Sequence, residues 1–134
     1  MTRNSIAPLL FLAAASAFAA NGTSVADNGD WRIYSQKANG NVHFYDASRV
    51  SRTSSLRRVW QRTRYKNSVM AASSYQSLLE IDCSERTERT LQRTFFSDRN
   101  WEDPAMSTDM KPKSKRSIRD GSATQHLAEI LCDG

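Results

Sequence analysis

Two cysteines, Cys83 and Cys132, place the tightest constraint on how this chain can fold, because its N-terminus has the features of an export signal. Exported proteins reach compartments in which disulfides form and persist. A bridge between the two residues closes a loop of about 50 residues, for which the loop-entropy estimate is roughly 4 kcal/mol of stabilisation. A metal pair and an intermolecular bridge are alternatives, but the chain has no C-x-x-C spacing and no histidine beside either cysteine.

Residues 1–19 are predicted to be a cleavable signal peptide. Arg3 supplies a positive charge, residues 6–18 form an apolar run, and Ala17-Phe18-Ala19 fits the small-residue cleavage pattern. The run is shorter than the about 20 apolar residues that span a bilayer, so an uncleaved anchor or a buried helix is a less favoured alternative. No cysteine stands near the cleavage point and no second hydrophobic segment follows it. We therefore expect an exported protein, periplasmic or secreted, that is not a lipoprotein and has no membrane span after cleavage.

The small, polar residues 20–30 are predicted to be a flexible lead-in to one domain over residues 31–134. Short runs rich in β-forming residues are separated by turn signals such as Asn39-Gly40. The predicted strands cover residues 31–36, 42–45, 56–66, 75–83, 87–96 and 117–119, and the predicted helix covers residues 124–131. The resulting fold class is α+β, with an antiparallel sheet of about five to six strands and a C-terminal helix.

Three connections are predicted from local signals. Asp46 is expected to cap a turn over residues 47–49, because its carboxylate can accept hydrogen bonds from nearby backbone N–H groups. Residues 70–72 are expected to make a short helical or loop excursion. Residues 98–117 are expected to be mostly loop, held to the domain by Trp101 and Met106, with a solvated basic stretch at residues 111–115.

The strand at residues 75–83 has the clearest alternation. Leu79, Ile81 and Cys83 fall on one side, while Glu80 and Asp82 fall on the other. Because side chains alternate across a strand, we expect the odd-numbered side to face the core and Cys83 to point inward with it.

The order of these pieces resembles the surface-adhesin protein E family of exported bacterial proteins. The resemblance covers about residues 31–132, and its motifs are Trp31-Arg32-Ile33-Tyr34, Tyr45-Asp46-Ala47-Ser48-Arg49-Val50, Arg58-Val59-Trp60, Glu80-Ile81-Asp82-Cys83, Arg89-Thr90-Leu91, Gly121-Ser122 and Ile130-Leu131-Cys132. It implies a sheet of about six strands whose C-terminal helix is held by the Cys83–Cys132 disulfide. It also implies a binding role, since some members act at the bacterial surface and bind host matrix and plasma proteins.

The chain has no acidic residue from Ala47 to Leu79 but seven basic ones, and its formal net charge is +5. Arginines interleaved with an aromatic side chain can bind phosphate, sulfate or a stacked base. The candidate binding surface consists of Arg57, Arg58, Trp60, Arg62, Arg64 and Lys66. Within it, Arg58, Trp60, Arg62 and Arg64 are expected to share one face of their strand. The favoured alternative is a cross-strand ladder in which these arginines pair with Glu80, Asp82 and Glu88.

No catalytic residue, cofactor or metal site is predicted, because the sequence has no P-loop, no G-x-G-x-x-G, no G-x-S-x-G and no spaced set of metal ligands. His43 and His126 could serve a small basic ribonuclease as acid and base, but nothing in the sequence brings them together. The basic stretch from Lys111 to Arg119 is more typical of a solvated loop than of a specific nucleic-acid site.

The predicted function is that of an exported, non-enzymatic envelope protein, a binding module for a host matrix protein or an anionic glycan. Two alternatives are a periplasmic structural or envelope-maintenance protein without a host ligand, and a small basic hydrolase. A homodimer formed through an exposed sheet edge is a further hypothesis.

Overall fold

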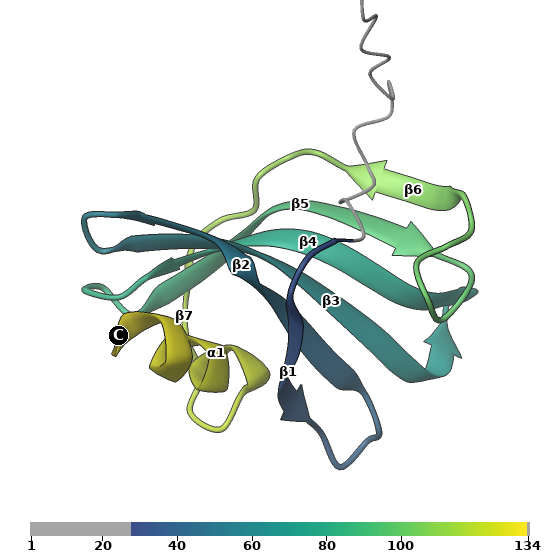
Figure 1. Cartoon of the computed structure of the whole chain (residues 1–134), viewed down its shortest axis with the longest axis horizontal. Helices are drawn as coiled ribbons and strands as arrows, with labels where there is room; N and C mark the ends of the chain where they lie inside the picture. The colour runs from purple at the N-terminus through teal and green to yellow at the C-terminus, as the bar shows by residue number, and fades with distance from the viewer. Residues whose placement is uncertain (1–27, 134) are drawn as a thin grey trace, which may run out of the picture.

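An antiparallel sheet packed against one helix forms the domain in the computed structural model, which describes residues 28–133 (Figure 1). Six strands pair in sequence order, and the short β7 pairs with β5. The elements are β1 (Trp31–Gln36), β2 (Val42–Thr53), β3 (Leu56–Val69), β4 (Ala72–Asp82), β5 (Thr87–Phe96), β6 (Ala105–Asp109), β7 (Arg116–Ser117) and α1 (Ala123–Cys132). The predicted α+β class and sheet are confirmed. The predicted signal peptide lies outside the described residues, as does the predicted lead-in up to residue 27.

Helix α1 packs on one face of the sheet, which we call the helix face, and no helix of residues 28–133 covers the opposite, outer face (Figure 1). Leu127 and Leu131 are fully buried against Val59, Leu79 and Ile81, and these residues form the centre of the hydrophobic core. Ser122 begins the helix as its N-cap, because its hydroxyl accepts a hydrogen bond from the backbone N–H of Gln125 at 3.1 Å. The expected inward side of residues 75–83 is therefore the side that meets the helix.

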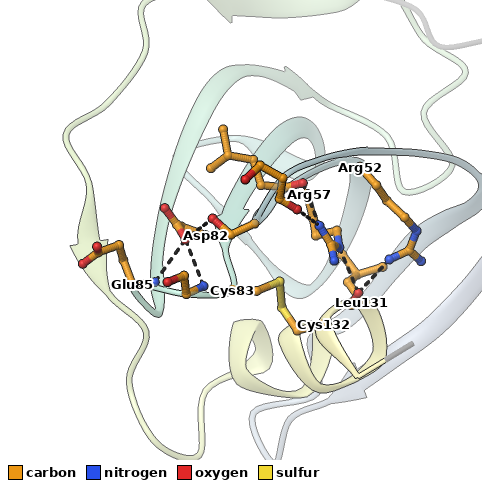
Figure 2. The surroundings of a disulfide bond; sticks show 11 residues. Arg52, Arg57, Asp82, Cys83, Glu85, Leu131 and Cys132 are labelled. Atoms are coloured by element: carbon orange, nitrogen blue, oxygen red, sulfur yellow. Dashed lines mark hydrogen bonds between the residues drawn. A yellow bond between two sulfur atoms is a disulfide. The ribbon is translucent and has the colours of Figure 1, made fainter.

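The disulfide joins the end of β4 to the last residue of α1, as Figure 2 shows. The Cα atoms of Cys83 and Cys132 are 5.6 Å apart. Beside it, the guanidinium groups of Arg52 and Arg57 donate hydrogen bonds to the carbonyl oxygen of Leu131, at 2.8 and 3.1 Å. A helix C-terminus has unpaired carbonyl groups and a partial negative charge, so two cations there stabilise it. This shared acceptor explains how the two arginines can lie directly opposite each other in the β2–β3 register.

Strand β2 is longer than predicted, because the turn expected at residues 47–49 is a bulge within the strand. The β2–β3 register shifts between Tyr45 and Val50, and pairing then continues to Thr53. Asp46, which is fully buried, accepts hydrogen bonds from the backbone N–H groups of Asp30 and Ser48, at 2.9 and 3.0 Å, and from Arg49. The hydrogen bonds expected of Asp46 are present, but they do not end the strand, because β2 continues to pair with β3 beyond the bulge.

Two further connections differ from prediction. Residues 70–72 make no excursion, because Met70 and Ala71 form a two-residue turn between β3 and β4 in which both have positive φ, 50° and 69°. The segment at residues 98–117 contains strand β6, which pairs with β5. Trp101 holds this segment to the sheet as expected, through an indole N–H that donates to the carbonyl oxygen of Tyr75 at 3.0 Å. Met106 stays 45% exposed.

No helix within residues 28–133 is long and apolar enough to cross a membrane.

Replacing both cysteines by serine should lower the free energy of unfolding by roughly 4 kcal/mol, because the linked residues are 49 positions apart and the bridge restricts a long loop of the unfolded chain. Urea denaturation of the Cys83→Ser/Cys132→Ser variant and of the oxidised wild type measures the difference. Reduced wild-type protein is the control and should match the variant. Equal stability of all three samples would show that the core holds α1 without the bridge.

Candidate binding surface

The six residues of the predicted binding surface do not all lie on one face. Arg58, Trp60, Arg62 and Arg64 share the outer face, as expected from their even spacing along β3. Arg57 lies on the helix face and binds the end of α1 through Leu131. It therefore does not belong to an outer binding surface, because its side chain alternates to the side that carries Val59.

A three-residue ionic cluster crosses the outer face on adjacent strands. Glu80 on β4 lies opposite Arg58 on β3 and opposite Arg89 on β5. Each guanidinium Nε donates to a different carboxylate oxygen of Glu80, both at 2.8 Å. Glu80 is only 2% exposed, whereas Arg58 is 50% exposed. Burial alone raises the pKa of Glu80, but the hydrogen bonds and charges of Arg89 and Arg58 outweigh it and place that pKa below its ordinary value.

The predicted cross-strand ladder exists at Glu80 but not at the other two carboxylates. Asp82 accepts hydrogen bonds from the Ser55 hydroxyl and from the backbone N–H groups of Ser84 and Glu85, at 2.9 to 3.0 Å. Glu88 accepts from Arg116 and Thr124, at 3.4 and 3.2 Å. Its side chain belongs to the helix face, because Glu88 lies opposite Ile81 in the register.

Arg62 is a buried structural residue at 8% exposure. Its guanidinium carbon lies 4.2 Å from the ring centroid of Trp31 and 4.9 Å from that of Trp101, and its Nε donates to Gln76 at 3.0 Å. Arginine stacks well between aromatic faces, and desolvation strengthens the attraction. The sequence did not indicate this arrangement, because Trp31 and Trp101 lie far apart along the chain.

Arg64 and Lys66 follow Arg62 along β3, and the two residues have different contacts. The Arg64 guanidinium lies 5.2 Å from the Trp101 ring and donates to the carbonyl oxygen of Arg99 at 3.0 Å. Lys66 is exposed, and its backbone is held by Asn41 and Arg99. Of the predicted residues on the outer face, Arg62 and Arg64 therefore contact the loop that carries Trp101.

What is left is a smaller surface, which we call the outer-face patch: Arg58, Trp60, Leu78, Glu80 and Arg89. Trp60 and Leu78 lie opposite each other on β3 and β4, and both are half-buried. Two arginines share one carboxylate, so the patch has one unit of excess positive charge beside an apolar pair. Arg89 and Leu78 were not among the predicted binding residues, although their places on neighbouring strands put them beside Arg58 and Trp60.

The two histidines occupy separate environments. His43 is on β2, and its Nδ1 lies 2.8 Å from the Thr63 hydroxyl, which in turn bonds to Gln61 at 3.1 Å. Burial lowers the pKa of His43 to about 4, with a smaller contribution from the charge of Lys37. His126 is exposed on α1. Within residues 28–133 no group of three or more His, Cys, Asp or Glu side chains could hold a metal ion.

Removing both arginine charges should destabilise the domain, because Glu80 would stay charged and buried without a cationic partner. We expect Arg58→Gln/Arg89→Gln to cost on the order of 2 kcal/mol, less than a fully buried pair, since Arg58 is half-exposed. Adding Glu80→Gln should restore part of the loss, because an amide has no charge to desolvate. Chemical denaturation of both variants tests this, and a triple variant less stable than the double one would contradict it.

The buried His43 should make the protein less stable in mild acid. The unfolded chain takes up a proton near the ordinary pKa of 6.5, while the folded chain resists until about pH 4. The free energy of unfolding therefore has its full value above pH 6.5 and falls by up to roughly 3 kcal/mol as the pH drops toward 4. Thermal unfolding of His43→Asn should show a flatter decline across this window, whereas the His126→Asn control should follow the wild type. If stability fell equally with pH in all three proteins, the loss in mild acid would not come from His43.

The family model described as "Surface-adhesin protein E" matches residues 31–133. A structure of Haemophilus influenzae protein E in crystal form II has a TM-score of 0.63 at 11% sequence identity, covering 83% of this chain and 91% of that chain. A second structure of Haemophilus influenzae protein E has a TM-score of 0.61 at 11% identity, covering 83% and 88%. At this identity the likeness shows the fold alone.

A search of curated protein sequences finds no match. The family model, however, spans nearly all of the described domain, and the predicted resemblance is confirmed. The chain belongs to the surface-adhesin protein E family, which makes it an adhesin-like, surface-associated protein.

Proposed function

We propose that this protein is an exported, non-enzymatic adhesin that binds an anionic partner through the outer-face patch. The partner is an anionic glycan or an acidic surface of a host matrix protein. The observation that supports this proposal best is the excess positive charge of the Arg58–Glu80–Arg89 cluster, held at fixed positions on the outer face of the sheet. Export through a cleaved signal, without a lipid anchor, is part of the same proposal.

The cluster has the chemistry of an anion-binding site. Arginine presents its donors in a planar fork that matches carboxylate and sulfate groups. Glu80 fixes each arginine through its Nε, so less side-chain freedom is lost when a ligand binds. Trp60 beside Arg58 adds an apolar surface on which a sugar ring or an aliphatic side chain can pack. The net positive charge of the chain also favours the approach of an anionic partner.

The environment of His43 supports binding over acid–base catalysis. With a pKa of about 4, His43 is almost entirely neutral at pH 7, so the imidazolium form that a general acid needs is scarcely populated. Its Nδ1 is occupied by Thr63 within a network that continues through Gln61 to the hydroxyl of Tyr34, at 3.2 Å. A network of this kind positions side chains in the core and needs no catalytic explanation.

Heparin retention tests the proposed surface. The Arg58→Gln/Glu80→Gln/Arg89→Gln variant removes one net positive charge while it keeps hydrogen-bonding side chains at all three positions. We expect it to elute from a heparin column at lower salt than the wild type and to bind immobilised matrix proteins more weakly, because binding by arginine–anion pairs is screened by salt.

The matched control is Arg119→Gln, which removes one positive charge at an exposed position before α1. If only net charge matters, both variants elute together, and the outer-face patch is then not the binding site. Thermal unfolding of each sample shows that reduced retention does not come from loss of the fold. Protease treatment of intact cells separates a surface protein, which is cleaved, from a periplasmic one, which is protected.

A further inference from the structure

Helix α1 covers only part of the helix face, and an apolar groove lies beyond it. In Figure 1 the helix lies below the end of the sheet that carries β7, away from β6. The groove has a volume of about 390 Å³ and is lined by side chains of β3, β5, β6 and the β3–β4 turn. The lining residues that matter here are Tyr65, Val69, Met70, Arg93, Phe95 and Met106.

A row of aromatic rings crosses the face at this groove. The ring centroids of Tyr65 and Tyr75 are 5.6 Å apart, and those of Tyr75 and Phe95 are 5.9 Å apart. All three side chains are only half-buried. Aromatic rings contribute much of the binding energy of protein interfaces when a partner covers them. The row is therefore a rigid, partly solvated floor that another chain can cover.

Arg93 lies over this floor and forms no ion pair with an acidic side chain of residues 28–133; its Nη2 donates a long hydrogen bond to the Thr90 hydroxyl, at 3.5 Å. Its guanidinium carbon is 4.9 Å from the Tyr75 centroid and 5.9 Å from that of Phe95. The buried Nε of Arg93 has no hydrogen-bond partner within the described part of the chain. Asp109 lies opposite Arg93 in the β5–β6 register, but its carboxylate pairs with Lys113 at 2.6 Å. A carboxylate from a ligand would give Arg93 the charged partner that it lacks.

The turn at the rim of the groove is unfavourable for the residues that form it. Met70 and Ala71 both have positive φ, where Asn and Gly are the preferred residues of a two-residue hairpin turn. Met70 is also 93% exposed. Its flexible thioether side chain suits an adaptable contact surface. Strain concentrated in an exposed methionine beside an apolar groove points to a contact that the isolated domain does not make.

We propose that this groove is a docking site for an extended peptide segment of a partner protein, one that carries an apolar side chain next to an aspartate or glutamate. The apolar side chain packs on Tyr65 and Phe95 between the methionines, and the carboxylate pairs with Arg93. An extended peptide fits because the groove is open: its rim residues Val69, Met70 and Met106 are all well exposed. The site lies on the opposite face from the outer-face patch and is independent of the function proposed for that patch.

Selection of a displayed library of random short peptides on the immobilised protein tests this site. Enriched peptides should place an apolar residue beside Asp or Glu. Their affinity should fall about tenfold or more for Arg93→Gln, since a hydrogen-bonded charged pair is lost. Affinity should also fall severalfold for Met70→Asn/Ala71→Gly, although that variant should unfold at the same temperature as the wild type or higher, because it relieves the turn.

The matched control is Met110→Asn, which changes another exposed methionine, 62% exposed, that does not line the groove. It should leave peptide affinity unchanged, and all three variants should leave heparin retention close to that of the wild type apart from the charge lost at Arg93. The proposal is overturned if no such peptides are enriched, or if the enriched peptides bind the Arg93 and Met70 variants as tightly as they bind the wild type.

Discussion

The contact between α1 and the sheet is the interaction on which the rest of the domain depends. A ten-residue helix is not stable by itself in water, so it must be held by packing and by its ends. Leu127 and Leu131 provide the packing, and the Cys83–Cys132 bridge fixes the last residue. Arg52 and Arg57 satisfy the Leu131 carbonyl at the same point. The core, the disulfide and the two arginines thus all hold the C-terminal end of this short helix. Its N-terminal end is held by the Ser122 cap and by the hydrogen bond from Thr124 to Glu88.

The short helix also explains why charged and aromatic side chains remain partly exposed on both faces of the sheet. One helix cannot cover a sheet of six strands, and on the outer face residues 28–133 provide no helix, only the loop that carries Trp101 over Arg62 and Arg64. The chain stabilises the uncovered regions with side-chain pairs instead of a second hydrophobic core. Glu80 is buried under two arginines, and Arg62 is buried between two tryptophans. The pairing at Glu80 satisfies a buried carboxylate while leaving part of Arg58 at the surface.

Local patterns predicted the elements whose cause is local. The alternation at residues 75–83 identified the side of β4 that meets α1, and the serine-led helix was placed to within one residue at each end. The errors come from long-range pairing. No residue near Asp46 indicates that β3 continues unbroken beside it. The Met70–Ala71 turn contains neither Asn nor Gly, the residues that usually indicate a two-residue hairpin turn. The site was half predictable: the shared face of Arg58 to Arg64 follows from spacing, but the burial of Arg62 depends on Trp101, which the fold brings from another segment.

The likeness to Haemophilus influenzae protein E at 11% identity indicates how few residues this fold requires. Backbone pairing in the sheet is largely independent of side-chain identity, whereas the helix contact and the bridge require particular residues at a few positions. Surface residues are then free to differ without loss of the scaffold. Ligand specificity in such a domain must therefore be derived from each chain's own surface. The residues that we propose for this role are Arg58 and Arg89 on one face and Arg93 on the other, because each positions a cation that the sheet does not fully neutralise.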